Sequence, residues 1–123
     1  MSPDKNQSFP TRLRFALHGL AHALGSERSL RFQATCFVLL LGTLAWLQPA
    51  PLWWAVLLLA GAGVLAAELF NTAIEHLVDH LHPEVHPRIR VVKDCAAAGV
   101  LLSVGGALAV AVAFAVHLLR GAH

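Results

Sequence analysis

The stretch LAAELFNTAIEHLVDH, residues 65–80, places polar side chains directly behind a long apolar run. The run from Leu52 to Ala67 is almost wholly apolar and predicts a membrane-spanning helix. If that helix continues, its turn of about 100° per residue puts Glu68, Asn71, Glu75 and Asp79 on one stripe. An ionisable side chain at the edge of an apolar span costs free energy, so the stripe predicts a functional site.

The stripe also has a simpler interpretation, as the solvated face of a helix that leaves the membrane. That interpretation accounts for Asp79 and Glu75 but poorly for Glu68, which directly follows the apolar run. Carboxylates and Asn are hard oxygen ligands suited to Mg²⁺, and a carboxylate can also act as a general base. Because Lys93 and Asp94 follow after a short loop, these residue types indicate phosphate chemistry. The sequence contains no P-loop motif, so metal and side chains would have to hold a nucleotide.

The composition is that of a membrane protein. The 123 residues are 57% hydrophobic and 13% charged, whereas soluble domains carry about 25% charged residues. The net charge of +2 is too small to indicate binding to nucleic acid. We expect an all-α integral membrane protein with residues 1–8 disordered and one domain over residues 9–119. Its expected elements are a surface helix over 9–25 and spans over about 32–48, 52–70 (continuing to about 81) and 95–119.

The segment from Phe9 to Gly25 predicts an amphipathic helix. Its leucines recur at spacings of four, three and four residues, and arginines and histidines fill polar positions between them. Such a helix is too polar to span, so we expect it to lie on the membrane surface.

The distribution of Lys and Arg predicts the orientation. These residues concentrate in the N-terminal segment and after residue 81, whereas the turn QPAP at 48–51 has none. The positive-inside rule then puts the N-terminus in the cytoplasm and the C-terminus outside. The expected location is the cell membrane, which is the inner membrane in a Gram-negative host.

The histidines offer a rival metal site. His76 and His80 are four residues apart, and His82 and His86 follow, a spacing that can bind zinc. On the helical wheel His76 and His80 project to a different side from the acidic stripe, and no cysteine is close. A second alternative is a membrane path for ions, but the first and third spans carry no charged residues to build one.

The segments AELFNTAIEHLVD and HPEVHPRIRVVKD together resemble the small bacterial membrane kinases that include diacylglycerol kinase and undecaprenol kinase. The family pattern is E-x-x-N-[ST]-A-I-E-x-x-[VI]-D, a short loop, and K-D at the start of the last span. Every one of these positions is matched here. GSERSLRF also resembles the acidic segment that precedes the first span in that family. The likeness covers about residues 9–119.

The resemblance implies a homotrimer whose active sites lie between protomers. It implies a lipid kinase that uses ATP and Mg²⁺ to phosphorylate diacylglycerol to phosphatidic acid at the cytoplasmic face. The alternative acceptor is undecaprenol. Gln33 stands where diacylglycerol kinases carry a second acidic residue, and SERSLRF is nearer the undecaprenol kinase style ERNxRIH.

The resemblance also implies roles for individual residues. Glu68 looks like the general base for the lipid hydroxyl, with Asn71 and Asp79 as supports. Glu27 and Glu75 look like ligands for the metal on the nucleotide. The residues that look like nucleotide contacts are Glu84, His86, Lys93 and Asp94, with Arg12 as the candidate phosphate contact and Arg14 as its alternative.

Overall fold

A computed structural model describes residues 6–121, which form four α-helices and no strand. The helices are α1 (Phe9–Ser26), α2 (Arg28–Leu47), α3 (Pro51–Leu81) and α4 (Pro87–Leu119). The last three are long and apolar enough to cross a membrane, which confirms the all-α architecture with three candidate spans. Most of the segment expected to be disordered, residues 1–8, lies outside the described residues.

Two helices begin earlier than the sequence pattern predicts. The α2 helix begins at Arg28 rather than near residue 32, and α4 begins at Pro87 rather than at residue 95. The segment HPEVHPRIR, which lies between the last two expected spans, is therefore a loop only up to His86. Proline is favourable at the start of a helix because its missing N–H would have no partner there. The His86 Nδ1 atom accepts a hydrogen bond from the Arg88 amide at 3.1 Å, which caps this helix end.

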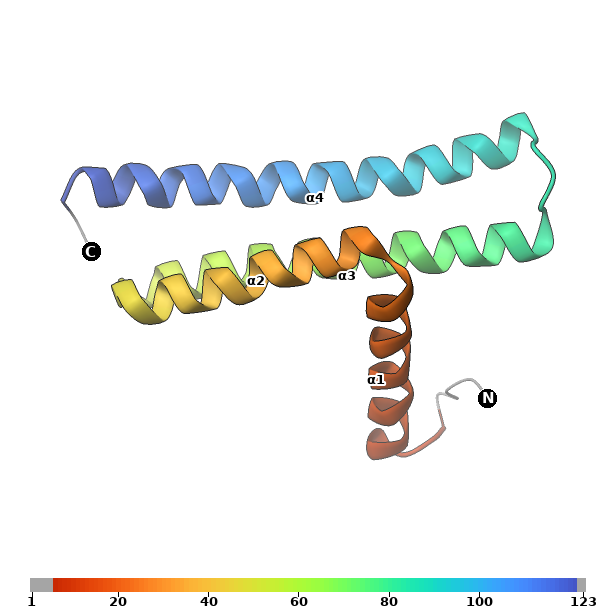
Figure 1. Ribbon diagram of the computed structural model, residues 1–123, viewed down its shortest axis with the longest axis horizontal. Helices are drawn as coiled ribbons and strands as arrows, with labels where there is room; N and C mark the ends of the chain where they lie inside the picture. Colours follow the sequence, from red (N-terminus) through yellow and green to blue (C-terminus); the bar gives the residue numbers. More distant parts are fainter. Residues whose placement is uncertain (1–5, 122–123) are drawn as a thin grey trace.

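The α3 helix is the centre of the structure. It packs along α2 and α4, whereas no Cα atom of α2 lies within 8 Å of a Cα atom of α4 (Figure 1). Near the 48–50 turn, Leu44, Leu57 and Phe114 form a buried cluster, and the Trp53 ring lies 5.1 Å from the Phe114 ring. The three long helices therefore depend on α3 for their mutual arrangement.

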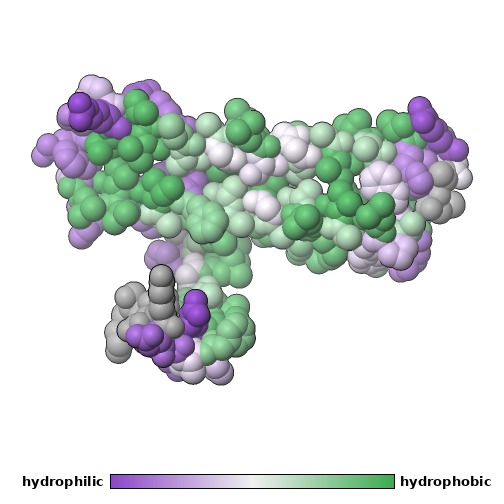
Figure 2. Space-filling view, turned by 180° about the vertical axis from the view of Figure 1, so that it is seen from behind, coloured by the Kyte–Doolittle hydropathy of each residue, from purple (hydrophilic) through white to green (hydrophobic). Residues whose placement is uncertain are grey.

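Much of the apolar surface stays uncovered. Large apolar side chains on all three long helices are exposed, for example Phe32, Leu59 and Leu102. Figure 2 shows hydrophobic side chains along the length of this body, with hydrophilic side chains gathered at its two ends and on α1. Such a surface suits lipid or other copies of the chain, because apolar exposure carries no cost in a bilayer.

The α1 helix leaves the body at a steep angle, as Figure 1 shows. A guanidinium group fixes the bend: Arg31 Nη1 on α2 donates to the carbonyls of Leu24 and Gly25, at 2.9 and 3.1 Å. These carbonyls belong to the last turn of α1, where no later residue of the helix offers them a backbone N–H group. The Glu27 residue between the two helices is thereby held at the corner of the fold.

The α2 and α3 helices are in close contact at Gly61. A Cβ atom at this position would lie 2.6 Å from Cδ1 of Phe37, whereas a Cβ atom at Gly63 would meet nothing within 4 Å. Gly61 therefore permits an approach of the two helices that other residues would prevent.

We predict that Gly61→Ala destabilises the protein relative to Gly63→Ala on the same helix. Overpacking costs about 1–3 kcal/mol, while both variants gain the helix propensity of Ala, about 1 kcal/mol. Thermal unfolding of the two variants in the same detergent, followed by circular dichroism, measures the difference. Equal midpoint temperatures would contradict the close approach of Phe37.

Candidate active site

Glu68 is buried on the side of α3 that faces α2, with 6% of its surface exposed. Each carboxylate oxygen accepts a hydrogen bond from α2. The Ser29 hydroxyl donates to Oε1 at 2.7 Å, and the Gln33 amide nitrogen donates to Oε2 at 3.2 Å. A buried charge needs such partners, so these contacts explain how a carboxylate is tolerated beside the apolar run.

The early start of α2 is what supplies these partners. Ser29 and Gln33 are four residues apart, so they lie on one face of the first two turns of α2. The sequence motif assigns no role to Ser29, and Gln33 is only a departure from the family pattern. Their spacing just before an apolar helix was the available signal, but it does not reveal which helix they face.

One turn further along α3 lies a second polar group. The Asn71 amide nitrogen donates to Oε1 of Glu75 at 3.3 Å, and Thr72 is buried beside them with 5% of its surface exposed. The Asn71 Oδ1 atom is buried and has no hydrogen-bond partner within the described residues. This pair has the geometry that the helical stripe predicted.

Glu27 reaches the same helix from the corner between α1 and α2. Its Oε1 atom lies 3.3 Å from Nε2 of His76, and the His22 ring of α1 lies edge-on to the His76 ring at 6.2 Å. Three helices therefore meet around His76. The contact brings Glu27 to the residue that follows Glu75.

The donor set fits Mg²⁺ better than a closed zinc site. Residues 6–121 contain no group of three or more His, Cys, Asp and Glu side chains placed to hold a metal ion. Mg²⁺ usually takes one or two carboxylates and completes its shell with substrate phosphates and water, so Glu27 and Glu75 are sufficient in kind. The unpaired Oδ1 of Asn71 adds a hard oxygen acceptor beside Glu75.

The four histidines of the zinc alternative do not come together. His76 contacts Glu27 and His22, while the rings of His82 and His86 lie 6.2 Å apart at the loop. His80 is exposed on the last turn of α3.

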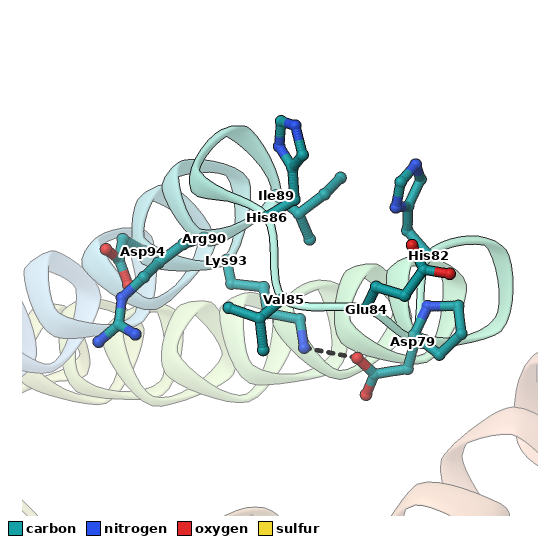
Figure 3. A pocket seen from close by; sticks show the side chains of 10 residues that line it. Asp79, His82, Glu84, Val85, His86, Ile89, Arg90, Lys93 and Asp94 are labelled. Atoms are coloured by element: carbon teal, nitrogen blue, oxygen red, sulfur yellow. Dashed lines mark hydrogen bonds and ion pairs between the residues drawn. The ribbon is translucent and has the colours of Figure 1, made fainter.

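A polar pocket of about 240 Å³ lies where α3 passes into α4 (Figure 3). Asp79 lies here, where its Oδ1 atom is 2.5 Å from the Lys93 ammonium group. The pocket contains five of the predicted site residues, namely Asp79, Glu84, His86, Lys93 and Asp94. Arg90, which was not predicted as a site residue, also lines the pocket, as does His82, which was named only in the zinc alternative. Arg90 falls in the first turn of α4 because that helix begins at Pro87.

The predicted site residues thus form two groups. Glu68, Asn71, Glu75 and Glu27 lie along residues 68–76 of α3, whereas the Asp79 group lies at the C-terminal end of that helix. Arg12 belongs to neither group, since it is exposed on the first turn of α1.

An apolar groove of about 340 Å³ is lined by residues of all three long helices, and its α3 residues precede Glu68 in the chain. Phe37 and Leu40 line it from α2, Gly61 from α3 and Val104 from α4. Gln33 also lines the groove, so one side chain contacts both the buried carboxylate and the apolar surface.

Comparison with known proteins agrees with the sequence motif. The family model for prokaryotic diacylglycerol kinase matches residues 14–115. The chain is 37% identical over 84 residues to undecaprenol kinase from Bacillus subtilis, an alignment that covers 67% of each protein. It is 33% identical over 102 residues to diacylglycerol kinase from Synechocystis, covering 77% of this chain and 58% of that protein.

The family match spans both polar groups and all three candidate spans apart from the last residues of α4. Both relatives are lipid kinases by name. The chain therefore belongs to the prokaryotic diacylglycerol kinase family, whose members are membrane lipid kinases.

Proposed function

We propose that this protein transfers the γ-phosphate of ATP to the hydroxyl group of diacylglycerol at the cytoplasmic membrane face, with Mg²⁺. The observation that carries the proposal is the buried Glu68, which is hydrogen-bonded from α2 at the edge of an apolar span. A lipid hydroxyl lies at this depth, and the groove lined by Gln33 offers apolar surface for its chains. A non-enzymatic ion path would need charges within all three spans.

Glu68 acts as the general base. Its carboxylate accepts the proton of the lipid hydroxyl while the alcohol oxygen forms a bond to the γ-phosphorus of ATP. The bond from that phosphorus to the bridging oxygen breaks, and its electrons leave with ADP. Asn71, one turn along the same face, supports the reacting group.

Glu27 and Glu75 would hold Mg²⁺ on the nucleotide. Both belong to the polar group around the middle of α3, and their oxygens match the ligand preference of this ion. When bound, Mg²⁺ supplies positive charge that offsets the charge of the phosphates. To act as a metal ligand, Glu27 would give up its contact with His76.

The polar pocket at the end of α3 binds the nucleotide. It combines the cations Lys93 and Arg90 with the hydrogen-bonding groups of Glu84, His86 and Asp94. Lys93 binds phosphate oxygens with its free N–H donors, while Asp79 keeps its ion pair with the ammonium group and holds it in place. Arg12 contacts phosphate from α1.

The membrane arrangement follows from the angle of α1. A helix that crosses the direction of the spans lies along the surface when the spans are upright (Figure 1). Its leucines Leu13, Leu17 and Leu20 are exposed and enter the headgroup region. The N-terminus is cytoplasmic and the C-terminus is outside, because Lys and Arg concentrate at the end of the molecule that holds α1 and the loop between α3 and α4.

The working form is a homotrimer with sites between protomers. The uncovered apolar surface of the long helices supports such packing, and one protomer alone is inactive. In a Gram-negative host the protein lies in the inner membrane.

Two lipids are candidates for the phosphate acceptor. Diacylglycerol is our first candidate because the match to a diacylglycerol kinase covers more of this chain, 77% against 67%. Undecaprenol is the second because identity is higher to an undecaprenol kinase, 37% against 33%.

The acceptor is tested by ATP consumption with each lipid in the same detergent micelles. We expect Mg²⁺-dependent ADP release with diacylglycerol, at a kcat/KM at least about tenfold above that for undecaprenol, the ratio for a difference of 1.4 kcal/mol. The reverse order would exchange the two lipids, and turnover with neither would contradict the lipid kinase.

The base is tested by Glu68→Gln, which keeps the shape of the side chain but cannot accept the proton. We expect turnover to fall by at least about 10²-fold, since general base catalysis contributes 10²–10⁴-fold. Size-exclusion chromatography should show an unchanged assembly. A purified variant that kept most of the wild-type rate would remove Glu68 from this role.

The metal ligands are tested by Glu75→Gln, with Glu84→Gln in the nucleotide pocket as the comparison. We expect Glu75→Gln to raise the free Mg²⁺ concentration at half-maximal rate by roughly tenfold or more. Glu84→Gln should raise the KM for ATP with little change in the Mg²⁺ requirement. Rates measured against free Mg²⁺ at saturating ATP separate the two; identical Mg²⁺ curves for wild type and Glu75→Gln would contradict the assignment.

A further inference from the structure

The two partners of Glu68 share a chemical property. A Ser hydroxyl and a Gln amide can each donate or accept a hydrogen bond, whereas Lys and Arg can only donate. Ser29 holds one carboxylate oxygen of Glu68 and Gln33 the other, so no cation contacts this carboxylate within the described residues. Gln33 also has a spare acceptor, because its Oε1 atom is buried and lacks a partner in residues 6–121.

We infer that Ser29 and Gln33 are positioning residues that hold Glu68 in both of its protonation states. The inference rests on the proposed function, in which Glu68 gains the proton of the lipid hydroxyl. It adds two residues of α2 to a reaction that the sequence motif assigns to α3 and its neighbours.

The inference follows from the free-energy cost of a buried carboxyl group, Glu68, that changes from hydrogen-bond acceptor to donor. As a carboxylate, Glu68 accepts from Ser29 and Gln33, as observed. Once protonated, the carboxyl O–H needs an acceptor, and a partner that can only donate would leave it unpaired. An unpaired buried polar group is costly, so a donor-only partner would oppose the proton transfer.

Both partners can make the exchange without moving the backbone. The Ser29 hydroxyl rotates so that its oxygen faces the carboxyl proton. The last torsion of Gln is broad and roughly two-fold, so half a turn of the Gln33 amide exchanges Nε2 for the unpaired Oε1. The orphaned oxygen of Gln33 is then the acceptor for the protonated state. The proton afterwards leaves to water, and both partners return to donating.

A second contact of Gln33 connects its hydrogen bond with Glu68 to the substrate. Its side chain also lines the apolar groove, so it lies between the groove and Glu68. A lipid in that groove approaches the carboxylate past the Gln33 amide. The carboxylate therefore has to be fixed in direction before the hydroxyl arrives, and two hydrogen bonds from one helix achieve this.

The test compares Ser29→Ala, Ser29→Thr, Gln33→Met and Gln33→Lys in the purified full-length protein. We expect Ser29→Ala and Gln33→Met to lower kcat by about 10–100-fold, the loss of a hydrogen bond to a charged group. The KM for ATP should stay within about threefold, because the nucleotide pocket lies elsewhere. Ser29→Thr should restore most of the rate, since it keeps the hydroxyl.

Gln33→Lys tests the second protonation state. Lysine still donates to the carboxylate but cannot accept from the carboxyl group, so kcat should fall as far as in Gln33→Met. A rate near that of wild type for Gln33→Lys would overturn the two-state role.

Thr35→Ala is the matched control for Ser29→Ala. Thr35 lies on the same helix, and its hydroxyl donates to the Arg31 carbonyl of its own helix at 2.8 Å. It should therefore keep the wild-type kcat.

Failure of the inference and failure of the proposed function give different results. If Glu68→Gln is inactive while Ser29→Ala and Gln33→Met turn over at the wild-type rate, the positioning role is overturned and the base remains. If Glu68→Gln itself stays active, the proposed base is overturned. A fall in kcat for Ser29→Ala that Ser29→Thr does not restore would indicate a packing effect and also overturn the inference.

Discussion

A carboxylate buried at the end of an apolar helix is the constraint on which this structure depends. Removing an ion from water costs several kcal/mol unless hydrogen bonds replace its hydration. Here the replacement comes from α2, through Ser29 and Gln33. The α2 helix must therefore start early enough to place both residues beside Glu68, and Gly61 permits the close approach of Phe37 further along the same interface.

This constraint also explains how α3 carries groups for one substrate in the bilayer and for another in water. The α3 helix begins among apolar side chains, reaches Glu68 at the apolar boundary, and carries Asp79 beside a polar pocket near its end. A lipid alcohol is confined to the bilayer while ATP stays in water, so a kinase for such an alcohol needs its groups along this line. The bend held by Arg31 then brings Glu27 to the same stretch of α3.

The sequence predicted which residues share a face of one helix better than it predicted which residues of different helices contact each other. The lengths of the apolar runs predicted three spans, and the helical wheel put Asn71 and Glu75, which contact each other, on one face. The contacts that complete the site join distant residues: Ser29 with Glu68 are 39 apart and Glu27 with His76 are 49 apart. No periodicity within one helix encodes such pairs. The start of α4 at Pro87 was missed because two prolines were interpreted as a loop, although a proline also favours the first turn of a helix.

The central claim is that Glu68 acts through its contacts with α2, and a double-mutant cycle tests it most directly. Steady-state kcat would be measured for wild type, Ser29→Ala, Glu68→Gln and the variant with both changes. The account predicts that Ser29→Ala lowers kcat in the wild type but causes no further loss in Glu68→Gln, because its effect passes through that carboxylate. Independent losses that multiply in the double variant would contradict it.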